Sequence, residues 1–172
     1  MTMTALTLNE VFELPLERRE FLQGELIVPP APEPSHQDAV FRIAYAVQTH
    51  LLQNPVGRIY LAPLDVVIAG EASQPDFIFV AADQIEIIKD KRIEGVPKWL
   101  VEIVSPTSHK RDFETKKTLY LENGVQEYWV VSPEGRVIWV FTPMDTEGKV
   151  HGTGTLSPSV LPDLKLEVAK IF

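Results

Sequence analysis

The sequence predicts a single α/β domain over residues 1–172, in which helices flank a small mixed β-sheet and a hairpin precedes it. Its length and its 45% hydrophobic content suit one buried core. Apolar runs rich in β-branched and aromatic residues predict strands, and two segments with helical spacing of apolar residues lie among them. The predicted strands are 59–69, 77–80, 99–104, 127–131 and 136–141.

The N-terminal part is predicted to form a hairpin or edge strand followed by a connector. In segment 21–28, Gly24 separates two short apolar runs, as in a tight turn between strands. Four of the six residues in segment 29–34 are prolines, which cannot donate backbone hydrogen bonds. We therefore expect an extended connector there.

An amphipathic helix of about 16 residues is predicted after the connector. Ser35 and Asp38 have the spacing of a cap at its start. The apolar residues behind this prediction are Phe41, Ile43, Ala44, Val47, Leu51 and Leu52. Such a helix should pack on the sheet.

The C-terminal part should begin with an antiparallel hairpin. Strands 127–131 and 136–141 are separated by Ser-Pro-Glu-Gly at 132–135, a turn sequence. After residue 143 the chain is rich in Gly, Thr and Pro, which predicts a loop. A weak apolar alternation over 164–168 predicts a short edge strand at the end.

Composition and charge exclude several kinds of site. The chain has no cysteine, so disulfides, thiolate catalysis and sulfur-ligated metals are excluded, and any metal must bind oxygen or imidazole. The four histidines lack the short spacing of zinc ligands, and neither nucleotide-binding glycine motif is present. No apolar run is long enough to span a membrane, and no secretory signal is evident. We expect a cytoplasmic protein without a membrane partner.

The net charge of −8 opposes nucleic-acid binding by the molecule as a whole. Eight of the 16 basic residues nevertheless lie between residues 89 and 117. This cluster is either a solvated face or a local nucleic-acid-binding surface, which would include Lys110, Arg111 and Lys117.

Glu102 is the most informative candidate for chemistry. It lies within Leu-Val-Glu-Ile-Val at 100–104, where apolar residues at both strand parities predict a strand buried on both faces. A carboxylate there must be protonated, paired with a cation or bound to a metal, because burying it unpaired costs several kcal/mol. A structural ion pair with Lys or Arg is the alternative to a functional role.

Asp76 is the second candidate, because it follows Pro75 at the start of the apolar strand 77–80. Alone, it suits a turn or the entry to a strand. Two carboxylates on neighbouring strands can, however, hold Mg²⁺ or Mn²⁺ through oxygen. Asp65 could approach the same point, although a bulge or a satisfied hydrogen-bonding role is the alternative.

A second helix is predicted over 108–123, with Gly124 suited to its C-cap. Hydrolysis of a phosphodiester needs a metal and a cation that orients water or neutralises developing charge. Lys116 and Lys117 of this helix are both candidates, because each lies about 50° from the centre of the apolar face at 100° per residue. Both could equally be lysines at the border of an amphipathic helix.

Several motifs, taken in order, resemble those of one family. They are Pro75 and Asp76; Pro97; the run 101–108; Arg111, Asp112, Lys116 and Tyr120; Gly124 and Val125; and the run 127–133. Together they resemble the Uma-two family of putative nucleases, of the PD-(D/E)xK restriction-endonuclease-like superfamily. The resemblance covers about residues 20–142 and leaves 143–172 as a C-terminal extension.

The resemblance implies a restriction-endonuclease-like core with a carboxylate-held Mg²⁺ site. By position, Asp76 and Glu102 match the acids of the superfamily and Lys116 matches a lysine of the family's helix. The superfamily's usual lysine, two residues after the glutamate, is replaced here by Val104. Glu25 matches an N-terminal acid of the family and is either a further metal ligand or an exposed strand residue.

These observations predict a metal-dependent endonuclease that hydrolyses DNA, with Asp76, Glu102 and Lys116 as catalytic residues. The alternatives are a nuclease fold that has become a binding or assembly module, and a hydrolase of small phosphate esters. We also expect a homodimer or larger homo-oligomer, because apolar strand edges would otherwise be exposed.

Overall fold

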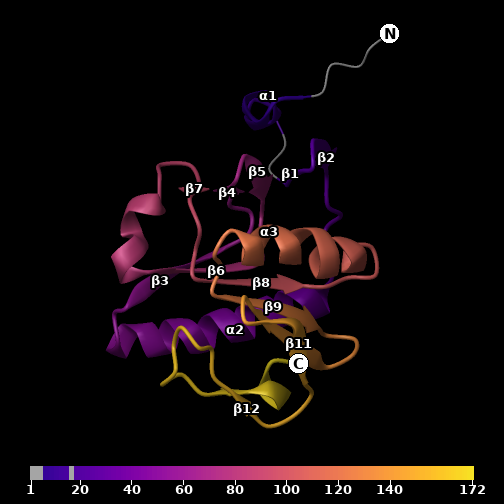
Figure 1. Cartoon of the computed structure of the whole chain (residues 1–172). Helices are drawn as coiled ribbons and strands as arrows, with labels where there is room; N and C mark the ends of the chain where they lie inside the picture. Colours follow the sequence, from indigo (N-terminus) through magenta and orange to yellow (C-terminus); the bar gives the residue numbers. More distant parts are fainter. Residues whose placement is uncertain (1–5, 16–17) are drawn as a thin grey trace.

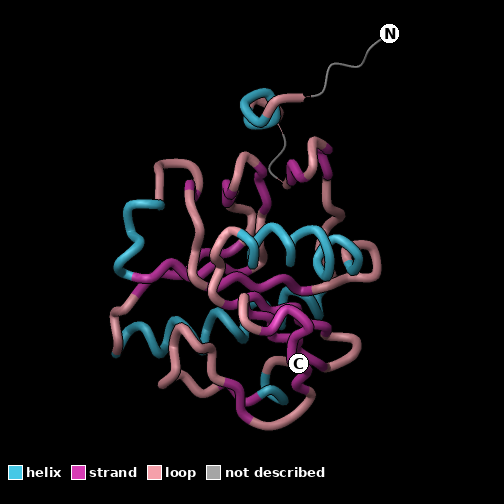
Figure 2. Tube along the Cα trace, viewed as in Figure 1, coloured by secondary structure: helices cyan, strands magenta, loops and turns pink. Residues whose placement is uncertain are grey.

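The computed structural model describes residues 6–15 and 18–172, and its main layer is a six-stranded mixed sheet (Figures 1 and 2). The strand order is β11-β10-β9-β8-β6-β3. Only β8 and β9 pair in parallel, and the other neighbours are antiparallel. The strands are β3 (Gly57–Leu61), β6 (Phe77–Ala81), β8 (Trp99–Ile103), β9 (Glu127–Ser132), β10 (Val137–Thr142) and β11 (Asp145–His151). The predicted α/β class is confirmed.

A smaller sheet lies beside the main one, in the order β2-β1-β5-β4-β7. Its strands are β1 (Glu20–Leu22), β2 (Glu25–Ile27), β4 (Val66–Ile68), β5 (Glu71–Ser73) and β7 (Ile93–Glu94). The hairpin predicted around Gly24 is confirmed, because β1 and β2 pair in antiparallel register. The short helix α1 (Leu8–Phe12) buries Val11 against this sheet.

Helices cover both faces of the main sheet (Figure 1). α2 (Pro34–Gln53) packs on one face, where alternate residues of β8 such as Trp99 and Val101 point. The other face carries the π-helical turn η2 (Arg111–Lys116) and α3 (Lys117–Glu122), which pack near Leu100. β8 is therefore buried on both faces, as its sequence predicts. Two further turns are 3-10 helices, η1 (Ala82–Ile87) and η3 (Val168–Lys170).

The first long helix begins earlier than its sequence pattern predicts. Its N-cap is Glu33, no side chain caps the first turn, and the cap predicted at Ser35 and Asp38 is wrong. Pro34 occupies the first turn, where a missing N–H costs nothing and a fixed φ favours the helix. The helix consequently has 20 residues. None of the helices in the described ranges is long and apolar enough to cross a membrane.

The run 59–69, predicted as one strand, forms two strands in different sheets. β3 pairs with β6 in the main sheet, whereas β4 pairs with β5 and β7 in the smaller one. Pro63 lies between them and cannot donate a ladder hydrogen bond, so the run is interrupted there.

The C-terminal segment contains more strand than its composition predicts. β11 lies in the predicted loop and extends the main sheet beyond β10. Most of its residues are exposed or half-buried, so its sequence lacks a clear apolar alternation. β12 (Thr155–Leu156) and β13 (Leu166–Glu167) pair as a separate two-stranded sheet, and β13 is the short edge strand predicted near the end of the chain.

The second helix, over residues 109–122, ends as predicted before Gly124. The Gly124 N–H donates to Leu121 O at 3.3 Å and the Val125 N–H donates to Tyr120 O at 3.0 Å. This pair of bonds is a Schellman motif, whose turning residue adopts positive φ. Gly124 has a φ of +99°, and a Cβ there would meet no atom within 4 Å. Only the backbone conformation therefore demands glycine.

We predict that Gly124→Ala lowers the free energy of unfolding by about 1 kcal/mol, the cost of a side chain at positive φ. Urea denaturation of the purified proteins measures this change. Gly152→Ala is the matched control, because Gly152 lacks positive φ and a Cβ there meets only ordinary contacts. Equal effects of the two substitutions would contradict the argument.

Candidate active site

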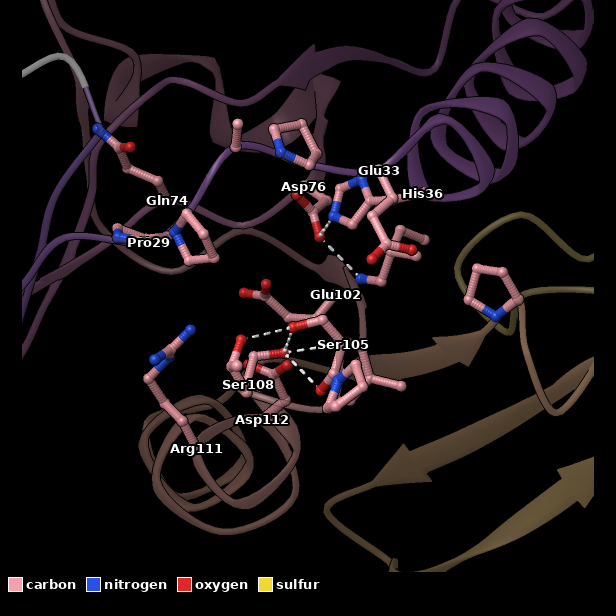
Figure 3. A pocket seen from close by; sticks show the side chains of 18 of the residues that line it. Pro29, Glu33, His36, Gln74, Asp76, Glu102, Ser105, Ser108, Arg111 and Asp112 are labelled. Carbon is pink, nitrogen blue, oxygen red and sulfur yellow. Dashed lines mark hydrogen bonds and ion pairs between the residues drawn. The ribbon is translucent and has the colours of Figure 1, made fainter.

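A pocket of about 340 Å³ lies where β8 ends, beside the start of α2 and the start of the second helix (Figure 3). The prolines of 29–32 and the loop 103–108 form parts of its wall. Its titratable and charged lining residues include Glu20, His36, Asp76, Glu102, Arg111, Asp112 and Lys116. These residues come from both sheets and both long helical segments, so the packing of the whole fold sets their positions.

Lys116 links acids from the two sheets. Its Nζ lies 2.8 Å from Glu102 Oε1 on β8 and 2.6 Å from Glu20 Oε1 on β1. Asp112, one helical turn earlier, has its Oδ1 at 3.7 Å from the same Nζ. Glu20, Glu102 and Lys116 are 2%, 4% and 2% exposed, so solvent screens these charges little. Lys116 and these three acids therefore form a buried ion network.

Tyr120 gives Glu102 a further partner. The Tyr120 hydroxyl donates to Glu102 Oε1 at 3.1 Å and lies 2.9 Å from Ser73 Oγ on β5. Burial raises the pKa of Tyr120 well above its usual range, and the nearby Glu102 carboxylate raises it further. The hydroxyl therefore keeps its proton and holds the Glu102 side chain in one orientation.

Asp76 is held at the end of β8. Its Oδ2 accepts a hydrogen bond from the Ile103 backbone N–H at 2.8 Å and lies 3.1 Å from His36 Nε2 on α2 (Figure 3). Because Ile103 follows Glu102 directly, this bond fixes Asp76 beside the second acid. The structure thus brings Asp76, Glu102 and Lys116 into one pocket.

The pocket contains more acidic side chains than permanent cations, and this excess shifts the pKa values of several of its residues. Burial raises the pKa of Glu102 well above its usual range, and Asp112, Asp76 and Glu20 raise it further against the effect of Lys116. Burial also raises the pKa of Asp112. Burial alone would lower the pKa of Lys116, but Glu102 and Glu20 raise it well above its usual range. Lys116 therefore stays charged.

Two oxygen atoms of this cluster lack hydrogen bonds. Asp112 Oδ1 and Glu20 Oε2 are buried and accept none within the described residues. Arg111 Nε lies 3.1 Å from Glu20 Oε2, but without the alignment of a hydrogen bond. Unsatisfied carboxylate oxygens are the hard donors that Mg²⁺ and Mn²⁺ prefer. Together with the carboxylates of Asp76 and Glu102, these two oxygens give the pocket the donor chemistry of a divalent-cation site.

The described part of the chain contains no three acidic or histidine side chains already gathered around one point as metal ligands. Magnesium usually keeps several waters and binds one or two carboxylates, whereas structural zinc needs four protein ligands. Asp76 and Glu102 can supply that pair.

Asp65 and Glu25 lie outside this pocket. Asp65 Oδ2 pairs with Arg19 Nη2 at 3.2 Å, and its Oδ1 accepts from Gln74 Nε2 at 3.0 Å. This is the satisfied hydrogen-bonding role considered from the sequence. Glu25 is exposed on β2 and lines a neighbouring hollow instead. The structure does not bring either acid together with Lys116.

The structure places the two adjacent lysines differently. Lys116 lies inside the pocket, whereas Lys117 Nζ donates to Thr146 O at 3.2 Å and lies outside the pocket lining. The turn 111–116 is π-helical, so its residues do not follow the 100° spacing used to compare the lysines. This local winding is a reason why periodicity alone could not choose between them.

The other two predicted basic residues, Arg111 and Lys110, differ in whether they reach the pocket. Arg111 lines the pocket, and Figure 3 shows its guanidinium directed into it. Lys110 is exposed and lines only the neighbouring hollow.

Sequence reasoning missed Glu20 as a site residue. Glu20 alternates with the buried Leu22 on a short strand, and that alternation was the only signal for an inward-facing acid. Asp112 was noticed only as part of a motif. Its spacing of four from Lys116 on a helix could have indicated an ion pair.

Comparison with known proteins supports a nuclease-like fold. The model of the family Uma2, described as putative restriction endonuclease, matches residues 7–169. The crystal structure of a putative nuclease belonging to DUF820 from Anabaena variabilis superposes with a TM-score of 0.84 at 22% identity, covering 97% of each chain. No curated protein matches this sequence. At this identity the structural likeness concerns the fold.

We predict that Lys116→Met lowers the free energy of unfolding by about 3 kcal/mol near pH 8, because it leaves buried carboxylates unpaired. The loss should be smaller near pH 5. At that pH the buried acids, whose pKa values are raised in the folded state, bind more protons in the folded state than in the unfolded state, and this uptake stabilises the fold. Stability gained from those protons is lost as the pH rises through the raised pKa. Urea denaturation at both pH values measures the difference.

Lys117→Met is the control for this substitution, because Lys117 lies outside the pocket, where its Nζ donates to Thr146 O and lies over the Phe141 ring. It should change stability by less than about 1 kcal/mol at either pH. A loss in Lys116→Met that did not depend on pH would contradict the account of the acids.

Proposed function

The chain belongs to the Uma2 family of putative restriction endonucleases. We propose that it is a metal-dependent endonuclease that hydrolyses the phosphodiester bonds of DNA. The reaction would take place in the pocket that contains Asp76, Glu102 and Lys116. Family membership gives the class of reaction, and the geometry of the pocket supports the roles of the residues.

The charge of the pocket is the observation that carries the proposal. Four buried carboxylates line the pocket, those of Glu20, Asp76, Glu102 and Asp112. The one buried cation among the described lining residues is Lys116, whereas Arg18 and Arg111 are half-buried. An uncompensated buried charge is costly, so the cluster must take up protons or a cation. A divalent cation would offset the excess of negative charge.

We assign the metal to Asp76 and Glu102, which would bind Mg²⁺ or Mn²⁺ through oxygen. Once bound, the cation polarises the phosphate and lowers the pKa of an attacking water. Asp76 is already oriented by the Ile103 N–H and His36, and Glu102 is oriented by the Tyr120 hydroxyl. This preorganisation favours catalysis, because the ligands need little rearrangement.

Lys116 would position the water or neutralise the charge that develops on the phosphate. Its Nζ reaches Glu102 from the helix at 2.8 Å, whereas Val104 occupies the superfamily's usual lysine position at the end of β8. The helix thus offers a cation beside the same acid. Arg111, directed into the pocket, would bind phosphate oxygens through its guanidinium.

A second candidate function is a nuclease fold that binds partners without cleaving DNA. The engagement of Lys116 by two acids and the net charge of −8 favour it, because both weaken the attraction for a phosphate. This alternative requires no affinity for a divalent cation.

We predict that the purified protein cleaves DNA only with Mg²⁺ or Mn²⁺, and that Asp76→Asn and Glu102→Gln each reduce the rate by at least about 100-fold. Incubation with labelled single- and double-stranded DNA, followed by gel analysis, measures the rate. Asp163→Asn and Glu86→Gln are matched controls, because both residues are exposed and lie outside the pocket. Full activity in either active-site variant would refute the assignment.

Calorimetry separates the two candidate functions without relying on cleavage. The endonuclease should bind Mn²⁺, and Glu102→Gln should weaken that binding, whereas Glu86→Gln should not. Absence of both cleavage and cation binding would favour the binding module.

A further inference from the structure

Arg18 lines the active-site pocket, where it is half-buried. Within the described ranges 6–15 and 18–172, it forms no ion pair and no hydrogen bond. An arginine carries five N–H donors in a planar group that stays charged at any physiological pH. Its guanidinium is therefore available to a ligand of the pocket.

The other two permanent cations of the pocket lining already contact acids. Lys116 Nζ lies 2.6 Å from Glu20 Oε1, and Arg111 Nε lies 3.1 Å from Glu20 Oε2. Among the lining residues that the structure describes, Arg18 is thus the permanent cation without an acidic partner. A phosphate that enters the pocket would not have to compete with a carboxylate for it.

The place of Arg18 in the chain explains why it reaches the pocket. It lies two residues before Glu20, and side chains two apart on an extended chain lie on the same side. The intervening Arg19 contacts Asp65 Oδ2 through Nη2 at 3.2 Å and does not line the pocket. The segment that brings Glu20 into the pocket therefore brings Arg18 there too.

The rim of the pocket carries cations on one side. Figure 3 shows Arg111 and Glu33 on opposite sides of the pocket. Arg18 belongs with Arg111, because it directly precedes the strand whose Glu20 contacts Arg111. The exposed rim acids, Glu33 and Glu134, come instead from the start of α2 and the turn after β9. A phosphate chain is therefore favoured beside Arg18 and Arg111.

We propose that Arg18 binds the phosphate next to the scissile one, so that the pocket selects a polynucleotide over a small phosphate ester. This inference rests on the proposed endonuclease function. The scissile phosphate would lie beside Glu102 and Lys116, where the metal is assigned. Arg18 pairs with none of the described acids, so it lies apart from that point. Its planar guanidinium matches two oxygen atoms of a backbone phosphate.

Arg18→Gln tests the proposal, because it removes the charge and keeps a polar side chain. Arg58→Gln is the matched control, since Arg58 is exposed on β3 and does not line the pocket. Arg18→Lys keeps the charge but loses the planar group. Thermal unfolding of the three variants verifies that they fold like the wild type.

Fluorescence anisotropy with labelled DNA duplexes of two unrelated sequences measures binding, with Ca²⁺ as the oxygen-binding cation in place of Mg²⁺. Gel analysis verifies that the duplexes stay intact. Arg18→Gln should weaken binding of both duplexes about tenfold, because a charged hydrogen bond is lost. It should also reduce the slope of log K against log salt concentration by about 0.9, the value for one phosphate contact.

The two other variants sharpen this measurement. Arg18→Lys should keep the salt dependence of the wild type, because a phosphate contact needs the charge, and Arg58→Gln should bind like the wild type. A salt dependence that is unchanged in Arg18→Gln would overturn the proposal. Weakened binding of only one of the two sequences would also overturn it, because a backbone contact does not depend on sequence.

Hydrolysis of bis-p-nitrophenyl phosphate with Mn²⁺ distinguishes failure of this inference from failure of the proposed function. The wild type and Arg18→Gln should hydrolyse this diester equally, because it has no second phosphate. Equal losses of diester hydrolysis and DNA binding in Arg18→Gln would overturn the inference alone. If the wild type hydrolyses neither the diester nor DNA, the proposed function fails and this inference fails with it.

Discussion

The ammonium group of Lys116, held between Glu20 and Glu102, is the interaction on which the site depends. Each partner comes from a different part of the fold: Glu20 from the smaller sheet, Glu102 from the main sheet and Lys116 from the helix between them. The contact can form only when the two sheets pack as they do here. Because all three groups are buried, the position of the helix determines whether the Lys116 ammonium neutralises the charges of the two acids.

Burying these charges lowers the stability of the fold at the site where catalysis is proposed. A core built only for stability would not bury four carboxylates around one buried lysine, because each unpaired charge loses its hydration. Hydrogen bonds from Tyr120 and the Ile103 N–H hold two of these acids in place instead of relieving their repulsion. Burial and like charge raise the pKa of Glu102, as is common at functional sites.

The sequence allowed the acid on the central strand to be predicted, because apolar residues at both parities around Glu102 indicated burial on both faces. Asp76 could be predicted from its place before a neighbouring strand. Glu20 could not, because it reaches the site through the antiparallel pairing of Phe21 with Ala72, which no local pattern reveals. Lys116 could not be separated from Lys117, because the helix is wound as a π-turn there. The run 59–69 was predicted as one strand because its apolar character continues past Pro63, where the chain passes between sheets.

If the acidic pocket binds one divalent cation between Asp76 and Glu102, a crystal of the protein soaked in Mn²⁺ should show it in the anomalous difference density. We expect one strong peak within coordination distance of a carboxylate oxygen from each of these residues, with Lys116 beside it. A pocket without a peak at saturating Mn²⁺, or a peak bound only by exposed acids elsewhere, would show that the pocket is not the metal site.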